Sequence, residues 1–350
     1  MIEKFTLDIE KWDSANDEDL GLVLPEGRQP VIHRYKSDNG QEFNVLVADG
    51  RKPGTSGSVE LSSTSHDYRI DELMIARKTI DAVRGNTLVI ASEIPGETKD
   101  PDGTLKTTGA WQTPKQTLAA MNGNYDLLAL EQLKAMYSTG AIEDGSEVQI
   151  SGQSMGAHMA ASMLRNIANG RFEHGLDVSR LYLFDPVNAS GDHSILHQFS
   201  TLGALMAEEK IRNTYYIQEN KDIGHTELVP FEQQSDETMK IDKYVKLRQA
   251  PAIYLTGAGL RKGFDSTLTD ALDARTELRN TEIIYARAVD STISHAQDML
   301  LAIEAIQKHG GRARFVSVEG PDNDDTPVAH HVRDSIRRSA SHADELRRFQ

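Results

Sequence analysis

Apolar residues in this chain follow two patterns. Some form short uninterrupted runs bounded by turn residues, which predict buried strands, and others recur every three or four positions, which predicts amphipathic helices. The strands predicted in this way span 58–62, 87–91, 147–151, 180–184, 283–289 and 313–318. The predicted helices span about 70–85, 123–137 and 157–169, with another between residues 290 and 310.

The first 50 residues differ from the rest, because they predict strands without helices between them. Segment 5–9 alternates between apolar and polar residues, and segments 31–35 and 43–47 are joined through the turn signal 37–40 (Ser-Asp-Asn-Gly), which is typical of a hairpin. After this antiparallel start, strands alternate with helices. The chain therefore predicts an α/β fold with a mostly parallel, doubly wound sheet.

The pentapeptide 152–156, Gly-Gln-Ser-Met-Gly, lies between a predicted strand and a predicted helix. Any G-x-S-x-G occurs by chance in roughly one chain of this length in ten, so its context must support it. A strand that enters the motif and a helix that leaves it make Ser154 the centre of a tight turn, where flanking glycines permit close backbone approach. The motif therefore indicates a serine nucleophile.

The order of elements from about residue 30 to the C-terminus resembles the α/β-hydrolase superfamily. The resemblance implies a core domain formed by residues 1–190 and 276–350, and a largely helical cap inserted at 191–275. Within this cap, segments 196–206 and 268–278 would supply helices. It also implies that an acid and then a histidine follow the nucleophile along the chain.

Candidates for both partners occur in that order. The acid is predicted to be Asp290, which follows strand 283–289, with Asp185 at the end of strand 180–184 as the alternative. The base is predicted to be His330 or His331, with a slight preference for His330. A serine hydroxyl needs an imidazole to take its proton, and a carboxylate fixes the tautomer of that imidazole.

The oxyanion hole is predicted from the backbone N–H of Met155 and a second backbone N–H near Ser63 or Thr64, of which Thr64 is chosen. Thr64 lies in a Ser- and Thr-rich turn that ends at His66, where members of the family usually show His-Gly. Two other histidines are predicted to have structural roles. We expect His295 to cap or line the first turn of a helix and His158 to be a packed or solvated helix residue.

Composition narrows the classes of partner. A net charge of -15 argues against binding to nucleic acid or to an anionic membrane, and no apolar run approaches the length of a membrane span. The absence of cysteine excludes disulfides, a cysteine nucleophile and Cys-ligated zinc. No export signal is visible, so we expect a cytoplasmic protein, and the composition is compatible with a homo-oligomer.

Two other ligand classes are considered and not predicted. The glycines of segment 257–263 follow a strand-like run, but their spacing is G-x-G-x-x-x-G rather than that of a dinucleotide-binding loop, and a flexible cap segment is expected there. His193 and His197 have helical spacing without the glutamate and third ligand of a zinc site. We therefore predict no cofactor and no metal.

Together these features predict a carboxylic ester hydrolase that acts through an acyl-enzyme on Ser154, with a small-molecule ester as its substrate. Two alternatives remain open. The chain could keep the fold as a non-catalytic module that binds a ligand or a partner, or it could be an acyltransferase that uses the same three residues.

Overall fold

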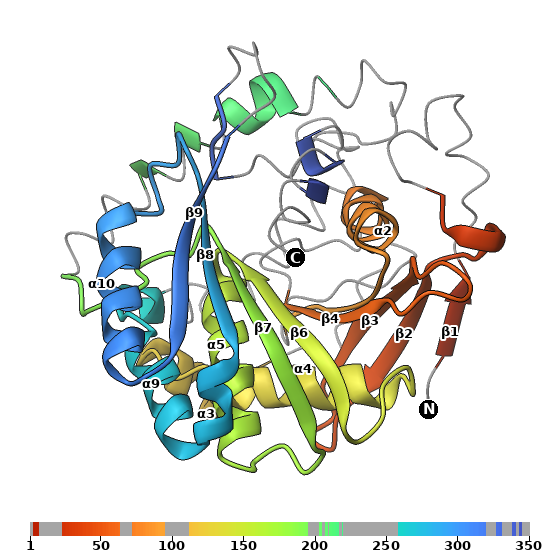
Figure 1. Cartoon of the computed structure of the whole chain (residues 1–350), viewed down its shortest axis with the longest axis horizontal. Helices are drawn as coiled ribbons and strands as arrows, with labels where there is room; N and C mark the ends of the chain where they lie inside the picture. Colours follow the sequence, from red (N-terminus) through yellow and green to blue (C-terminus); the bar gives the residue numbers. More distant parts are fainter. Residues whose placement is uncertain are drawn as a thin grey trace.

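A single mixed sheet forms the centre of the described part of the chain (Figure 1). The computed structural model describes residues 3–6, 23–63, 72–94, 112–194, 203–204, 207–208, 210–216, 219, 258–319, 327–330, 338–340 and 343–344. Within these residues the strand order is β1-β2-β3-β5-β4-β6-β7-β8-β9. The strands are β1 (Glu3–Thr6), β2 (Val31–Lys36), β3 (Glu42–Asp49), β4 (Ser58–Ser63), β5 (Thr87–Ser92), β6 (Ser146–Gln153), β7 (Leu176–Phe184), β8 (Glu282–Ala288) and β9 (Arg312–Val318).

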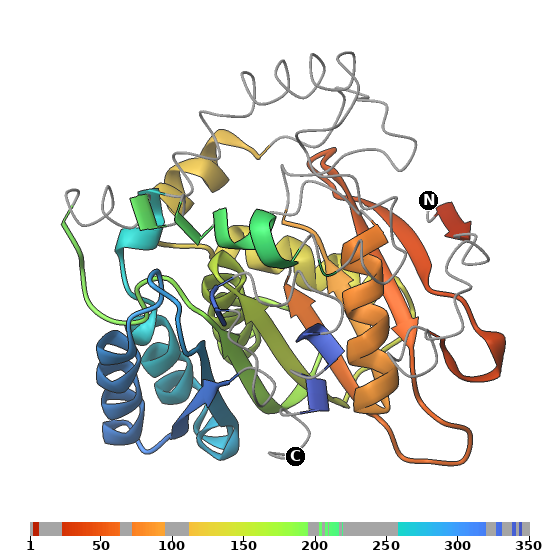
Figure 2. The same cartoon turned by 90° about the horizontal axis from the view of Figure 1, so that it is seen from above.

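The sheet is antiparallel at one end and parallel elsewhere. Strands β1, β2, β3 and β5 pair antiparallel in that order, and every pairing from β5 through β4 to β9 is parallel. Figure 2 shows the two ends, with the red and orange antiparallel strands at the right and the blue helix that precedes β9 at the left. The predicted mostly parallel, doubly wound sheet is confirmed, including its antiparallel start.

Helices cover both faces of the sheet. Helix α2 packs on β3 and β5 over one face, and α4 and α5 pack on the other, as Figure 1 shows. The longer helices are α2 (Glu72–Gly85), α3 (Pro114–Met121), α4 (Asp126–Ser138), α5 (Met155–Ala168), α9 (Asp265–Ala274) and α10 (Ala296–Lys308). The short helical turns are η2 (Pro25–Gly27), η3 (Arg212–Tyr216), η5 (Gly259–Arg261) and η6 (Thr276–Asn280).

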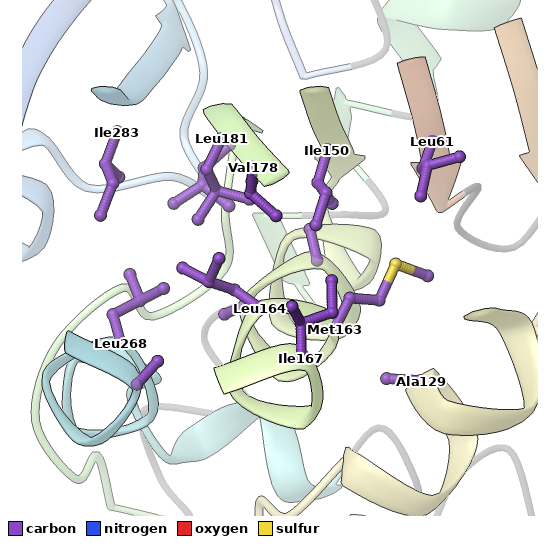
Figure 3. Packing of buried hydrophobic residues seen from close by; sticks show 14 of the residues in the cluster. Leu61, Ala129, Ile150, Met163, Leu164, Ile167, Val178, Leu181, Leu268 and Ile283 are labelled. Atoms are coloured by element: carbon purple, nitrogen blue, oxygen red, sulfur yellow. The ribbon is translucent and has the colours of Figure 1, made fainter. Parts of the chain in front are cut away.

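The largest apolar cluster lies between the sheet and α5. Met163, Leu164 and Ile167 recur at helical spacing on α5 and meet side chains of the parallel strands such as Ile150 and Leu181 (Figure 3). Because successive strand residues face opposite sides of a sheet, neighbouring residues such as Leu88 and Val89 belong to different clusters on the two faces. This burial fixes α5, and with it the end of β6, against the sheet.

Helix α9 extends this layer of core helices. Its buried residues Leu268, Ala271 and Leu272 belong to the same apolar cluster as α5, and the helix packs on both α5 and α10. The sequence placed α9 in the cap at 191–275, but its apolar stripe is buried against the core instead. Residues 195–202 and 220–257 lie outside the described residues, so a cap formed by the rest of this range stays a prediction.

Candidate active site

Ser154 occupies a strained turn between β6 and α5. Its backbone has φ 54° and ψ -122°, a left-handed conformation that residues with a side chain rarely adopt. A Cβ added to Gly152 would lie 2.0 Å from the carbonyl oxygen of Gly156, so the close approach of strand and helix requires glycine there. The sharp turn that the motif predicts is therefore present.

Two backbone hydrogen bonds hold this turn in place. The N–H of Ser154 donates to the carbonyl of Phe184 on β7 (2.9 Å), and the N–H of Ala157 donates to the carbonyl of Ser154 (3.0 Å). Ser154 keeps part of its surface accessible, whereas the neighbouring Met155 is completely buried. The strained residue is thus fixed from the sheet and from its own helix while part of its surface stays accessible.

The first amides of α5 are suited to an oxyanion. Met155 and Gly156 begin the helix, so their N–H groups have no acceptor within it, and the positive end of the helix dipole lies there. The Met155 side chain packs into a separate apolar cluster on this side of α5, with Ile94, Ala120, Tyr125, Leu128 and Met159. The role predicted for the Met155 amide remains a proposal.

The end of β4 lies beside this turn, because Ser63 pairs with Gly152 in the sheet register. The Ser63 hydroxyl donates to Oε1 of Gln132 on α4 (3.1 Å), so it is engaged in a buried polar contact behind the strand end. Thr64 and His66 lie outside the described residues, and the second oxyanion donor at Thr64 stays a prediction.

The segment 327–330 lies against Gln153, the residue that precedes Ser154. Gln153 donates from Nε2 to the carbonyl of His330 (3.0 Å), and Oε1 of the same side chain accepts from Arg77 on α2 (2.6 Å). His330 is almost fully buried, at 1% exposure. The structure therefore brings His330 against Gln153, the residue before Ser154, while His331 lies outside the described residues.

Two side chains hold the His330 segment from its other side. The His330 N–H donates to Oε2 of Glu208 (2.5 Å), and the Ala329 N–H donates to the hydroxyl of Tyr216 (2.9 Å). That hydroxyl in turn donates to the carbonyl of Pro327 (2.5 Å). The segment is thus fixed at three of its four residues by buried polar contacts.

Asp290 is bonded directly to the same segment. Its N–H donates to the carbonyl of Val328 (2.9 Å), and its Oδ2 accepts the Val328 N–H (2.8 Å). Val328 is two residues before His330, and Asp290 is solvent-exposed. The structure therefore brings Asp290, His330 and Ser154 to one end of the sheet.

Asp185 lies closer to the interior. It follows β7 with φ 39° and accepts the Ala288 N–H at Oδ1 (3.0 Å). Burial, helped by the nearby Glu208 carboxylate, raises the pKa of its carboxyl from 3.8 to about 7, although the Ala288 N–H, the Arg287 charge and the Ser294 hydroxyl oppose the rise. Near neutrality, Asp185 is therefore ionised only in part.

His158 is a packed residue on α5, one of the two readings expected for it. Its Nε2 lies 2.7 Å from the carbonyl of Val187, and its ring meets Phe264 and Tyr125 edge-on at 4.7 and 5.4 Å. Burial lowers the pKa of its imidazole to about 4. His295 occupies the N-cap position of α10, as expected, although its side chain makes no capping hydrogen bond.

The segments considered for other ligands have packing roles where they are described. A Cβ on Gly259 would lie 1.8 Å from the carbonyl oxygen of Ala120, and one on Gly263 would lie 2.5 Å from the N atom of Gly191. These two glycines are therefore closely packed against neighbouring backbone. Nε2 of His193 lies 3.3 Å from Oδ2 of Asp298, while His197 is outside the described residues.

No group of three or more His, Cys, Asp or Glu side chains that could hold a metal ion occurs among the described residues. No helix in this part of the chain has the length and apolar composition that crossing a membrane requires.

Glu208 and Tyr216 were missed by the sequence analysis. Both lie in the stretch between β7 and β8, where apolar positions show no clear period. Glu208 stands next to another glutamate and a lysine, a pattern typical of a solvated helix face. Only the contacts of these residues with segment 327–330 identify them.

Comparison with known proteins gives structural but no sequence relatives. No protein-family model matches the chain, and no curated protein matches it. A thioesterase domain from the curacin biosynthetic pathway superposes with a TM-score of 0.50 at 13% identity, covering 92% of this chain and all of that domain.

Two further solved structures are similar at lower scores. A hydrolase from Oleispira antarctica has a TM-score of 0.48 at 12% identity, covering 87% of this chain and 93% of its own. A puromycin-hydrolyzing peptidase from Mycobacterium tuberculosis has a TM-score of 0.47 at 10% identity, and the match covers 91% of this chain but only 38% of the peptidase. At such identities the likeness concerns the fold alone.

Proposed function

Because the chain has the α/β-hydrolase fold, we propose that it is a serine-dependent hydrolase, and specifically a carboxylic ester hydrolase. The observation that carries the proposal is the backbone of Ser154, with φ 54° and ψ -122° between β6 and α5. Such strain costs on the order of 1–3 kcal/mol and persists only where the surroundings impose it. Its location at an accessible serine supports a catalytic purpose.

The proposed reaction begins with attack of Ser154 Oγ on the ester carbonyl. His330 takes the hydroxyl proton and returns it to the departing alcohol, which leaves the acyl group bonded to Ser154 Oγ. A water molecule then gives a proton to the same imidazole as it adds to the acyl carbon. The bond between the acyl carbon and Ser154 Oγ breaks, the imidazolium returns the proton to Oγ, and the acid product leaves.

Asp290 is the acid that we propose for His330. Its carboxylate is bonded to the Val328 N–H, two residues from His330. Asp185 is the alternative, but burial raises the pKa of its carboxyl to about 7, and a partly protonated acid is less suited to stabilising an imidazolium. His331 remains the alternative base.

The negative charge that develops on the carbonyl oxygen needs donors that are already in place. We propose the Met155 N–H, at the beginning of α5, and a second donor at Thr64. Support for Met155 comes from its place next to Ser154, where a helix leaves its first amides without an internal acceptor.

Fluorophosphonate labelling tests this proposal. We expect the wild-type protein to be labelled and Ser154→Ala not to be. Ser266→Ala is a matched control, because Ser266 is an exposed serine in the first turn of another helix, α9, and it should be labelled like the wild type. An unlabelled wild type, or equal labelling of Ser154→Ala, would contradict the proposal and favour a non-catalytic module.

The reaction class is tested with p-nitrophenyl esters of graded chain length, with and without an added alcohol. We expect release of the free acid in both cases. An acyltransferase would instead form a new ester with the alcohol. The chain length that reacts fastest would identify the acyl group that the site prefers.

A further inference from the structure

Glu208 is a buried carboxylate that joins two separate loops. It is 1% exposed, and its Oε2 accepts the N–H of His330 at 2.5 Å. Its Oε1 accepts from the hydroxyl of Thr292 at 2.7 Å and also from the Thr292 N–H. Both carboxylate oxygens are therefore engaged by donors from different parts of the chain.

The two loops are those that carry the proposed acid and the proposed base. Thr292 is two residues after Asp290, and His330 itself is bonded to Glu208. A hydrogen bond to a carboxylate is shorter and stronger than one between neutral groups, particularly in a buried place. Glu208 thus connects the two loops, because it accepts hydrogen bonds from His330 in one and from Thr292 in the other.

Tyr216 supports the same arrangement from the same segment. Its hydroxyl contacts Pro327 and Ala329, and its ring packs with Val328 and Ala288 in a small apolar cluster. Glu208 and Tyr216 are only eight residues apart, so one short segment holds the loop of the base at both ends.

We propose that Glu208 is a positioning residue, which holds His330 at the distance from Asp290 and Ser154 that proton transfer needs. This inference rests on the proposed function. A proton moves only between groups within hydrogen-bond reach, and a misplacement of about 1 Å can slow a reaction by roughly 100-fold. In Glu208→Gln the side chain keeps its size, but its NH₂ group would face either the His330 N–H or the two Thr292 donors.

The test measures the rate constant of fluorophosphonate labelling, the concentration for half-maximal rate, and the fraction of protein labelled at completion. For Glu208→Gln we expect the rate constant to fall by roughly 10- to 100-fold, with the half-maximal concentration and the labelled fraction little changed. Thr292→Ala removes one donor at an exposed residue and should slow labelling by about 3-fold.

Asp126→Asn is the matched control for loss of a buried carboxylate. Asp126 is also buried, where it pairs with Arg165 and Arg171. Arg165 is eleven residues beyond Ser154, or about 16 Å along α5. This variant should lower Tm while the labelling rate constant of its folded fraction stays at the wild-type value.

The outcomes separate this inference from the proposed function. If Glu208→Gln loses labelled fraction together with folded protein but keeps the wild-type rate constant, Glu208 is only structural and the inference is wrong. If Glu208→Gln does not fold, an unchanged rate constant in Thr292→Ala overturns the inference. If the wild type is not labelled, or if Ser154→Ala is labelled equally, the proposed function fails and the inference fails with it.

Discussion

The proposed nucleophile Ser154 and its proposed partners are held by different kinds of interaction. Ser154 lies in one continuous segment, β6 to α5, and every residue of α5 except Arg165 and Ala168 is buried. Asp185, Glu208, Asp290 and His330 instead come from four separate segments and meet through hydrogen bonds to backbone groups.

The surroundings of α5 are thus held mainly by apolar packing, whereas the segments of the proposed acid and base are held mainly by hydrogen bonds. The packing around α5 depends mainly on shape, and pH affects it through the buried imidazole of His158. The proposed acid and base side depends on directional hydrogen bonds, and burial there raises the pKa of the Asp185 carboxyl. We therefore expect substitutions around α5 mainly to lower stability and substitutions on the other side mainly to change the rate, while the pH dependence of stability has opposite signs on the two sides.

The largest effect should come from the acid. Asp290→Asn keeps an oxygen that can accept the Val328 N–H, but it removes the charge that would stabilise the imidazolium. We expect kcat/KM for a p-nitrophenyl ester to fall by about 1,000- to 10,000-fold, or about 4 to 5.5 kcal/mol of transition-state stabilisation.

Asp185→Asn is the comparison variant for this prediction. Its carbonyl oxygen can still accept the Ala288 N–H, and we expect kcat/KM to change by less than about 10-fold. The reverse order, with the larger loss in Asp185→Asn, would transfer the role of the acid to Asp185.

The next effect is the pH dependence of stability that Asp185 causes. Asp185 keeps its proton in the folded protein up to a pKa of about 7, whereas the unfolded chain releases it near 3.8. The contribution of the protonated form is therefore complete below pH 3.8 and is lost as the pH rises to about 7. Relative to Asp185→Asn, the wild type should lose up to about 4 kcal/mol of unfolding free energy over this range.

For His158, on α5, the pH dependence of stability has the opposite sign. Burial lowers the pKa of its imidazole from 6.5 to about 4, so its contribution is complete above pH 6.5 and is lost as the pH falls to about 4. Against His158→Gln, the wild type should lose up to about 3 kcal/mol across this interval. Urea denaturation at several pH values measures both effects, and parallel curves for wild type and variant would refute either one.

Gly152→Ala tests the packing of the elbow directly. The added Cβ would meet the backbone of Gly156 at 2.0 Å, so strand and helix must separate. We expect a loss of about 2 to 3 kcal/mol of unfolding free energy in urea denaturation. Gly175→Ala is the control, because a Cβ there meets nothing within 4 Å and stability should change by less than about 0.5 kcal/mol.

The smallest effect is expected for Tyr216→Phe. The variant keeps the ring but loses the hydroxyl that contacts Pro327 and Ala329, at a cost of about 1 kcal/mol in stability. Labelling should slow by less than 10-fold, because Glu208 still holds His330. Tyr215→Phe, at the exposed neighbouring position, should match the wild type in both measurements.

Much of the fold was predictable because its causes are local. The alternation of buried strands and amphipathic helices appears in residue order, and the Gly-flanked Ser154 between β6 and α5 has a turn that neighbouring residues dictate. Helix α9 was also visible as an apolar stripe. Its partner was not, because the pattern shows that a face is buried but not against which element.

The sequence alone does not distinguish the environments of Asp185 and Asp290. Both follow a strand, so local pattern hardly separates them. In the tertiary structure the first is buried beside Glu208 with a raised pKa, while the second is exposed and bonded to Val328. Burial and charge neighbours decide these properties, and both depend on segments far away in the chain.

The sequence by itself determined the order of elements and the nucleophile turn, since hydrophobic period and glycine placement act within a few residues. Only the tertiary structure brought His330 beside Gln153 and placed Glu208 between the loops of Asp290 and His330. The physical reason is that one hydrogen bond across more than a hundred residues leaves no periodic signal, although it can set the geometry of a reaction.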